Sequence, residues 1–343
     1  MKQKKIKCVV WDLDLTIWDG VLTEDKRIEL RPDVKKIIET LDYRGILQSI
    51  ASKNDEKLAE KKLKEFGLYD YFIYPEINWH AKSVSIDKIA SSINISKDTI
   101  AFIDDQEFER NEVSFSHSEI LCIDGEKLDG LLEMSEFNPT FITVDSKNRR
   151  QMYQQDIERN QIEEAFEGTK EAFLKTLNLK MTITEAKEED LKRVEELTIR
   201  TSQLNSTGTI YSYEDLQKLL FSKTHKMFVV QLDDKYGSYG KIGLALIETI
   251  EEVWTIKLLI MSCRVISRGV GNVLLYYVMN KARKKAITLQ AEFIPTDRNK
   301  IMYITYKFSG FKEVEKTGEQ LIFEADLTHE KELPEYVYLP KEK

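Results

Sequence analysis

Residues 8–16 read Cys-Val-Val-Trp-Asp-Leu-Asp-Leu-Thr, so an apolar run ends in two carboxylates, Asp12 and Asp14, followed by Thr16. Carboxylates at the end of a parallel strand face the crevice where open α/β sheets bind ligands. Because the two carboxylates repel each other, we expect a cation between them, and Mg²⁺ prefers oxygen ligands of this kind. Alone, the pattern is equally compatible with an acidic loop that carries no chemistry.

Three further polar sites follow along the chain. A buried strand leads to Ser52, whose hydroxyl can hold a transferring phosphoryl group. Lys82 opens a helical pattern, and its cation can offset the charge of a nucleophile and a phosphate. The apolar run 99–103 ends in Asp104 and Asp105, of which one or both would complete the Mg²⁺ shell. This order of sites predicts phosphoryl-transfer chemistry.

The composition narrows the class of protein. The 343 residues, 42% of them hydrophobic, fit two domains. A net charge of −8 argues against a nucleic-acid binder, and the lack of an 18-residue apolar run predicts no membrane span. Residues 1–7 lead straight into a strand, so we expect a basic cap and not a signal peptide. Cys8, Cys122 and Cys263 lie in apolar runs, which indicates a reduced, cytoplasmic protein.

A change of pattern along the chain indicates two domains. Residues 1–125 alternate apolar strands with helical patterns, which is typical of a parallel sheet. Residues 146–178 are charged and favour a connecting pair of helices. From Met181 the pattern becomes a strand, two helices and three strands of antiparallel type, with a hairpin turn at 236–240. The predicted boundaries are domain one at 1–145, a helical linker at 146–180, domain two at 181–330 and a tail at 331–343.

Domain one has no room for a large cap. The connections from Thr16 to Asp33 and from Ser52 to Lys82 are short, and at most a flap at 18–22 fits. A site without a lid stays open to water and to large partners. We therefore expect the substrate either to be carried on a protein or to be closed in by domain two.

Domain two contains a glycine-rich turn between a strand and an apolar helix. Gly269 and Gly271 lie in this turn, and backbone N–H groups at such a helix start can bind a pyrophosphate. Cys263 ends the preceding strand, where a thiolate could relay an acyl group. Arg264 and Arg268 would lower the pKa of this thiol if they point the same way. With Gly269, Gly271 and Asn299, they are also the expected cofactor-binding residues. Three alternatives stay open. Cys263 is a small buried hydrophobic residue without a chemical role, Cys8 is the relay in its place, or neither thiol relays an acyl group.

Both halves of the chain resemble known families. The pattern Asp-x-Asp-x-Thr resembles motif I of the haloacid-dehalogenase (HAD) phosphotransferases, with Leu15 between its second carboxylate and Thr16. This resemblance implies that Asp12 is a nucleophile that forms an aspartyl-phosphate and that Asp14 is the general acid and base. The glycine turn resembles motif A of the GNAT acetyltransferases, although Ile266 stands where glutamine or arginine is usual.

A second GNAT feature follows near the end of domain two. Asn299, Tyr306, Gly310 and Phe311 match it, with Met302 where alanine is usual. The resemblance implies a channel for pantetheine and a tyrosine, Tyr306, that protonates the leaving thiolate.

The combination of the two domains resembles the FkbH-like family, and the resemblance covers almost the whole chain. The runs that carry it are 7–14, 50–55, 77–83, 102–106, 203–208, 261–265 and 295–299. It implies a Rossmann-like HAD domain with a parallel sheet and no large cap, followed by an α+β GNAT-like domain. Where the family usually has asparagine, this chain has Leu15, which we expect to change local packing and not roles.

The FkbH-like resemblance also implies an activity. Such proteins remove phosphate from 1,3-bisphosphoglycerate and load a glyceryl unit, as a thioester, on the phosphopantetheine arm of an acyl carrier protein for polyketide pathways. Asp12, the Asp14 backbone, and Asp104 or Asp105 would hold Mg²⁺. The alternatives are a small-molecule phosphatase with a GNAT-like binding domain, and a non-enzymatic module that docks a carrier protein.

Overall fold

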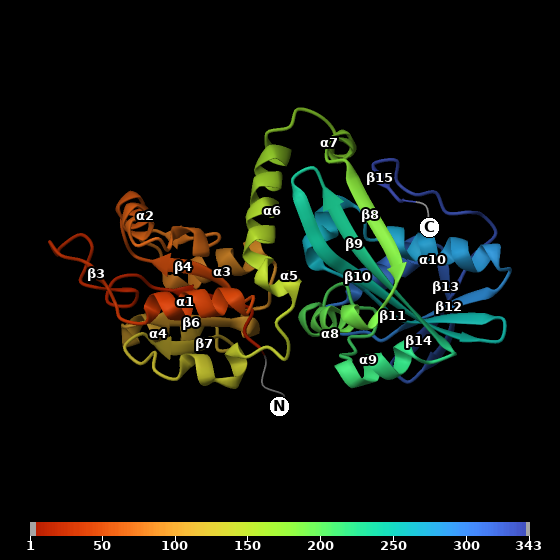
Figure 1. The fold of residues 1–343 in the computed structure, drawn as a ribbon, viewed down its shortest axis with the longest axis horizontal. Helices are drawn as coiled ribbons and strands as arrows, with labels where there is room; N and C mark the ends of the chain where they lie inside the picture. The colour runs from red at the N-terminus through yellow and green to blue at the C-terminus, as the bar shows by residue number, and fades with distance from the viewer. Residues whose placement is uncertain (1–4, 341–343) are drawn as a thin grey trace. The chain divides into compact units, whose positions relative to one another are not determined.

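The chain forms two compact units, Met1–Gln154 and Gln155–Lys343, and the division falls within helix α6 (Arg149–Glu164) (Figure 1). The computed structural model describes residues 5–340. Most of the expected basic N-terminal cap and the last three residues of the expected tail lie outside the described residues. No helix in the described part of the chain is long and apolar enough to cross a membrane.

Unit 1 is built on a parallel sheet of five strands in the order β5-β4-β1-β6-β7. The strands are β1 (Cys8–Trp11), β4 (Leu47–Ser52), β5 (Glu76–Ile77), β6 (Ile100–Asp104) and β7 (Leu121–Asp124). β1 lies at the centre and is buried along its whole length, which explains why its sequence is a continuous apolar run. The carboxyl ends of β4, β1 and β6 are therefore neighbours at one edge of the sheet.

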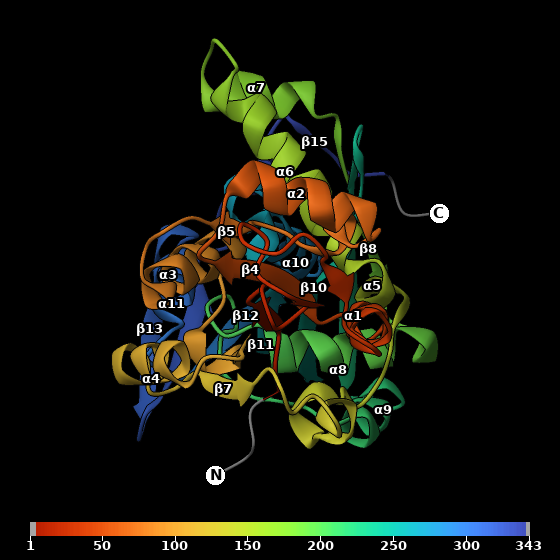
Figure 2. The same ribbon diagram turned by 90° about the vertical axis from the view of Figure 1, so that its left-hand side faces the viewer.

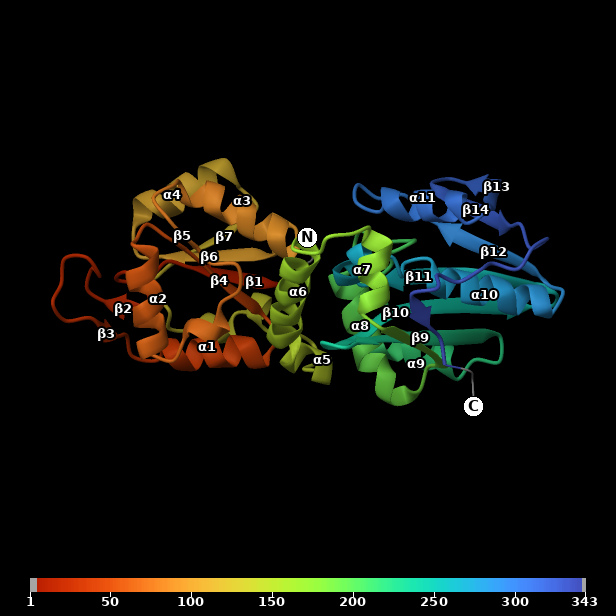
Figure 3. The ribbon, with the colours of Figure 1, turned by 90° about the horizontal axis from the view of Figure 1, so that it is seen from above.

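Helices cover both sides of this sheet, with α3 and α4 on one side and α1 and α2 on the other (Figure 3). Their bounds are α1 (Val34–Tyr43), α2 (Glu56–Glu65), α3 (Lys82–Ile93) and α4 (Glu107–Ser116), and a short α5 (Val144–Lys147) precedes α6. Only the small pair β2 (Trp18–Asp19) and β3 (Glu29–Leu30) is inserted after β1, as the short spacing predicts. The described residues of unit 1 thus contain no large cap.

Unit 2 is built on a sheet of eight strands in the order β13-β14-β12-β11-β10-β9-β8-β15. The strands are β8 (Leu179–Glu185), β9 (His225–Asp234), β10 (Gly237–Ile250), β11 (Val253–Met261), β12 (Thr288–Phe293), β13 (Phe311–Thr317), β14 (Gln320–Ala325) and β15 (Val337–Tyr338). Most neighbours are antiparallel, but β11 pairs with β12 and β8 with β15 in parallel. The region expected to be only a tail thus contributes a strand, β15.

From β8 to α10, the strands and helices of unit 2 follow the order that the sequence predicts. They are α7 (Lys170–Thr176), α8 (Leu191–Arg200), α9 (Tyr213–Leu220), α10 (Val273–Lys284) and α11 (Lys300–Phe308), and a 3₁₀ helix, η6 (Cys263–Arg268), follows β11. The hairpin between β9 and β10 turns at residues 235–236, and Gly237 and Gly240 after it have φ of 142° and 72°. Both values lie in the region that glycine adopts without strain.

Candidate active site

Three acidic side chains meet at the carboxyl edge of the unit 1 sheet. Asp12 follows β1, and its backbone N–H donates to the carbonyl of Ile103 in β6 (2.9 Å), so Asp12 and Asp104 end adjacent strands. One carboxylate oxygen from each of Asp12, Asp104 and Asp105 lies within 4.8 Å of the others. Three hard oxygen donors at this spacing fit an ion such as Mg²⁺.

The electrostatics of this group favour a bound cation. Burial, together with the charge of Asp12, raises the pKa of Asp104 to about 6, although Lys82 acts in the opposite direction. Burial and the charge of Asp12 also raise the pKa of Asp105. Carboxylates that are desolvated and crowded in this way are unfavourable as bare anions. A divalent cation would relieve both effects.

Lys82 is the cation that the protein itself supplies. It is the first residue of α3 and is buried, and its Nζ contacts Asp12 Oδ1 and donates to Asp104 Oδ2 (2.9 Å). Burial alone would lower the pKa of Lys82, but the two carboxylates outweigh it and raise that pKa. The lysine therefore stays charged beside the expected nucleophile, as its predicted role requires.

Asp14 lies in a different environment from the acidic group. Its Oδ1 accepts from the Trp18 indole N–H (2.8 Å) and the Leu22 backbone N–H (3.2 Å), and its Oδ2 accepts from Asn54 Nδ2 (3.0 Å). Burial raises the pKa of Asp14, whereas these hydrogen bonds lower it. A carboxylate that is fixed by side chains and not by the metal group is suited to moving a proton.

Ser52 and Thr16 complete this edge of the sheet. Ser52 is buried at the end of β4, the strand that pairs with β1. Thr16 Oγ1 accepts from the backbone N–H of Asp105 (3.1 Å) and so links the loop after β1 to the loop after β6. Trp18 and Asn54 were given no role from the sequence, because a tryptophan or an asparagine near a motif carries no spacing that would identify it as a partner of Asp14.

In unit 2 the expected pantetheine channel is filled by the chain itself. β11 and β12 are paired only from Val253–Thr288 to Ile256–Ala291. Beyond that point, residues 204–206 lie between them. The Ser206 N–H donates to the Leu259 carbonyl (3.0 Å), and the Ile294 N–H donates to the Ser206 carbonyl (3.1 Å). The backbone groups that an extended ligand would use are therefore already bonded.

Asn299 and Tyr306 belong to this closed arrangement. Asn299 is fully buried, and its Nδ2 donates to the carbonyls of Asn205 and Ile294 (2.9 Å each). Tyr306 is also fully buried, with its ring centroid 5.2 Å from that of Phe311. Burial raises the pKa of Tyr306, although the nearby Ser206 hydroxyl acts in the opposite direction. Both residues hold the fold here and do not face an open channel.

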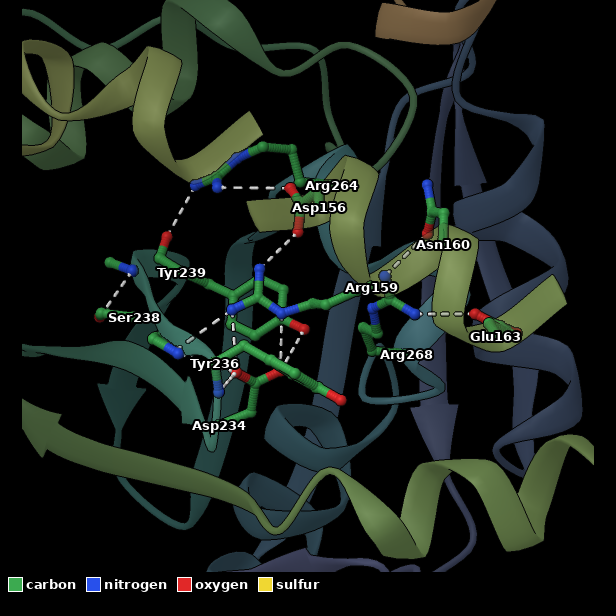
Figure 4. A network of polar contacts seen from close by, with 12 residues as sticks. Asp156, Arg159, Asn160, Glu163, Asp234, Tyr236, Ser238, Tyr239, Arg264 and Arg268 are labelled. Carbon is green, nitrogen blue, oxygen red and sulfur yellow. Dashed lines mark hydrogen bonds and ion pairs between the residues drawn. The ribbon is translucent and has the colours of Figure 1, made fainter. Parts of the chain in front are cut away.

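The two arginines that precede the glycine turn contact residues of α6 and of β10 (Figure 4). Arg268 is buried and donates to Glu163 (2.8 Å) and Asn160 (2.9 Å) of α6. Arg264 donates to the Tyr239 carbonyl (2.6 Å). These contacts explain the two arginines as parts of a structural network, in contrast to the predicted cofactor-binding role.

The two glycines of the turn differ. Gly269 has φ of 66° and closely approaches Tyr336, whose hydroxyl donates to the Gly269 carbonyl (3.2 Å). A Cβ at Gly271 would meet nothing within 4 Å. Of the two positions, only 269 requires glycine. The left-handed backbone and the close approach of Tyr336 explain this requirement, and a bound pyrophosphate is not needed to explain it.

The two candidate thiols differ in solvent access. Cys8 is fully buried in β1, whereas Cys263 begins η6 and is partly exposed. A relay that exchanges an acyl group with an external thiol needs access to that thiol. Of the two positions, only Cys263 meets this condition.

Comparisons with known proteins found phosphatases among the proteins similar to this chain. The chain is 28% identical to human magnesium-dependent phosphatase 1 in an alignment of 137 residues that covers 34% of this chain and 76% of that protein. The N-terminal phosphatase-domain part of a Bacteroides fragilis protein, solved with Mg, matches with 28% identity and a TM-score of 0.37, over 39% of this chain and 41% of that one. No protein-family profile matches the chain.

Acetyltransferases are found among the structural neighbours. The Escherichia coli ribosomal-protein-S18-alanine N-acetyltransferase matches with 16% identity and a TM-score of 0.34, over 44% of this chain and 97% of that one. The Thermoplasma acidophilum PaiA N-acetyltransferase, solved with coenzyme A, matches with 17% identity and a TM-score of 0.34, over 42% of this chain and 98% of that one.

The topology confirms the predicted fold class: unit 1 is an α/β unit with a parallel sheet and no large cap among its described residues, and unit 2 is an α+β unit with a mixed sheet. The chain is similar over part of its length to a magnesium-dependent phosphatase, and the predicted metal agrees with the one named for both phosphatase relatives. Membership of the FkbH-like family stays a prediction.

Proposed function

We propose that unit 1 is a Mg²⁺-dependent phosphatase of the HAD type. The observation that carries this proposal is the meeting of Asp12, Asp104, Asp105 and Lys82 at one strand edge, with Asp14 held separately by Trp18 and Asn54. Bound Mg²⁺ would neutralise charge on the phosphate and on Asp12. Asp12, Asp104 and Asp105 would hold it, with the Asp14 backbone as the further predicted ligand.

The chemistry of this chain's own residues follows in two steps. Asp12 attacks phosphorus, a new oxygen–phosphorus bond forms, and the bond to the leaving group breaks while Asp14 gives that oxygen a proton. Asp14 then takes a proton from water, whose oxygen attacks the aspartyl-phosphate and releases inorganic phosphate. Lys82 and Ser52 hold the phosphoryl group in both steps.

We further propose that the substrate is 1,3-bisphosphoglycerate and that the glyceryl unit is loaded on an acyl carrier protein for polyketide-type synthesis in the cytoplasm. Asp12 attacks the 3-phosphate, which is removed by the two steps above. The thiolate of Cys263, or that of the carrier, attacks the acyl carbon, a carbon–sulfur bond forms, and the acyl-phosphate bond breaks with loss of the 1-phosphate. Where Cys263 relays the acyl group, the carrier thiolate then attacks the Cys263 thioester and the Cys263 thiolate leaves. The support is the resemblance of seven runs to the FkbH-like family, together with the partly exposed Cys263, which begins η6 shortly after the end of β11.

A second candidate has a specific observation in its favour. It is a phosphatase of small molecules whose GNAT-like unit binds but does not catalyse. The insertion of residues 204–206 between β11 and β12, the burial of Tyr306 and the engagement of Arg268 by α6 all favour this candidate. It makes no use of Cys263.

Intact-protein mass spectrometry separates the two candidates. A phosphopantetheinyl carrier protein is incubated with this protein, Mg²⁺ and 1,3-bisphosphoglycerate. Glyceryl transfer predicts a glyceryl-sized increase in carrier mass, and a relay predicts its loss in Cys263→Ala, with Cys122→Ala as the control at another partly exposed cysteine. Phosphate release without any carrier adduct would support the second candidate. Loading by Cys263→Ala at the wild-type rate would assign the attack to the carrier thiol.

A further inference from the structure

An ion pair joins two loops at the carboxyl edge of the unit 1 sheet. Lys53 follows Ser52 at the end of β4, and Glu109 lies in the first turn of α4, shortly after Asp105. The Lys53 Nζ donates to Glu109 Oε1 at 2.6 Å. Neither side chain has a part in the phosphoryl-transfer steps derived above.

The topology places this pair beside the reacting groups. β4 and β6 flank β1 on its two sides, so the residues that follow β4 and β6 are separated by about 10 Å, two strand spacings. A contact between Lys53 and Glu109 must therefore pass by the end of β1, where Asp12 and Asp14 lie. The same loop carries Asn54, which donates to Asp14. Lys53 is thus at the mouth of the site.

Glu109 fixes the position of the lysine. Its side chain is only 7% exposed, and its Oε2 has no hydrogen-bond partner among the described residues. A buried carboxylate without its counter-charge is costly, so the pair does not open easily. Other polar residues of α4 are held by the protein in different ways. Arg110 donates to the carbonyls of Asp104 and Asp105 (2.7 Å each), and Glu112 accepts from Ser83 of α3. Helices α3 and α4 lie side by side (Figure 2).

Lys53, in contrast, remains open to a ligand. Its side chain is 35% exposed, and an ammonium group has three N–H donors, of which Glu109 takes one. An exposed cation at a fixed place near the phosphoryl site can bind a second anion on the substrate. In a HAD unit without a large cap, few other groups are available to recognise the part of the substrate that leaves.

We propose that Lys53 binds an anionic group on the leaving group of the phosphate ester, and that Glu109 positions Lys53 for this contact. The inference rests on the proposed phosphatase function and names its substrate class: phosphate esters whose leaving group carries a carboxylate or a second phosphate. Lys53 acts on binding and specificity, and the phosphoryl transfer itself stays with Asp12 and Asp14.

Steady-state kinetics with two substrates test the proposal. 3-Phosphoglycerate has a carboxylate on its leaving group, and p-nitrophenyl phosphate has no second anion. Lys53→Met is expected to raise KM for 3-phosphoglycerate by about tenfold or more, which is the loss of affinity expected when a charged hydrogen bond is removed. Its kcat for this substrate should stay within about twofold of the wild-type value. Both constants for p-nitrophenyl phosphate are expected to stay within about twofold. Lys57→Met, at an exposed lysine of α2, is the matched control and should change neither substrate.

Two further variants keep the test independent of folding. Lys53→Arg retains the charge and should recover most of the loss in KM, whereas Glu109→Gln should raise KM for 3-phosphoglycerate alone. If Lys53→Met does not fold, the double variant Lys53→Met/Glu109→Met is assayed in its place. The second substitution removes the buried carboxylate that the first leaves unpaired.

Three results would overturn the proposal. The first is an equal loss for both substrates, which would place Lys53 in the phosphoryl-transfer machinery or in the fold. The second is an unchanged KM for 3-phosphoglycerate in the folded variant. The third is a wild-type protein that hydrolyses neither substrate with Mg²⁺, and this result would remove the phosphatase function itself and so be distinguishable from the first two.

Discussion

The two units place polar side chains at strand ends with opposite results. In unit 1, the ends of β1 and β6 bring Asp12, Asp104 and Asp105 to within 4.8 Å of one another, and Lys82 adds its charge. In unit 2, the end of β11 is bonded to residues 204–206. The difference shows that a parallel strand edge forms a site only where no other segment of the chain satisfies its polar groups.

The largest expected effect tests unit 1 directly. Asp12→Asn should abolish phosphate release, by roughly four orders of magnitude or more, because an amide cannot act as the carboxylate nucleophile. Phosphate release is measured with p-nitrophenyl phosphate, and circular dichroism checks the fold. Asp129→Asn, an exposed aspartate of the same unit, is the control. Retention of more than about a tenth of the wild-type rate in Asp12→Asn would contradict covalent catalysis.

Removal of the metal should have the next largest effect on the same unit. Excess chelator should reduce phosphate release to background, and added Mg²⁺ should restore it, because Asp104 and Asp105 are disfavoured as bare anions. Binding should also stabilise the folded protein by about 2.7 kcal/mol at a hundredfold excess over Kd. Differential scanning calorimetry measures this shift independently of activity. An unchanged rate of phosphate release in excess chelator would show that the reaction does not need a metal ion at the acidic group.

The proximity of Asp12 and Asp104 in unit 1 could be predicted from the sequence because it follows from the sheet topology. Asp12 and Asp104 each follow or end an apolar strand, and β1 and β6 are parallel neighbours. Two such residues lie close together whatever conformation the loops after the strands adopt. Asn54 and Trp18 could not be assigned, since their contacts with Asp14 depend on the local path of two loops. Leu15 was read as a packing change, whereas the structure shows a backbone conformation that its side chain disfavours.

The fold of unit 2 was predictable, but its expected site was not. Alternating patterns gave the strands and helices, and Gly269 correctly marked a turn. The contacts of Arg268 with α6 and of Asn299 with Asn205 join residues far apart in the chain, and the local pattern contains no signal for them. A motif match at Asn299 and Tyr306 is equally well explained by the packing of the fold.

The third prediction concerns the network that engages the unit 2 arginines (Figure 4). Arg159 is fully buried, pairs with Asp234 through two hydrogen bonds of 2.8 Å and lies 4.1 Å from the centre of the Tyr239 ring. Arg159→Met leaves Asp234 as a buried charge without its counter-ion. The free energy of unfolding of unit 2 should therefore fall by about 3–5 kcal/mol.

Fluorescence can follow unit 2 alone in a suitable background. Trp254 is the tryptophan of unit 2, and the other three, at 11, 18 and 79, are in unit 1. Urea titrations in a Trp11→Phe/Trp18→Phe/Trp79→Phe background, read by emission at Trp254, would compare Arg159→Met with the exposed control Lys218→Met. Phosphate release by the same two variants, measured in the chain that keeps all four tryptophans, would report on unit 1. A loss below about 1 kcal/mol would mean that the network is not needed for stability. Equal loss of phosphate release would mean that the two units do not unfold separately.

The smallest expected effect is at Leu15, between Asp14 and Thr16. Leu15 has φ of 55° and is 43% exposed, so its side chain gains little from burial while its backbone occupies the left-handed region. That region costs an ordinary residue about 1–2 kcal/mol, and asparagine adopts it more readily. Leu15→Asn should therefore raise the free energy of unfolding of unit 1 by about 1 kcal/mol. The rate of phosphate release should stay within about twofold, because the backbone path that places Asp12 and Asp14 is retained.

The matched control is Leu58→Asn, an exposed leucine within α2, where asparagine has no conformational advantage and should lower stability slightly. A gain at both positions would assign the effect to the loss of exposed apolar surface, and no gain at Leu15 would show that the loop after β1 holds its conformation without strain.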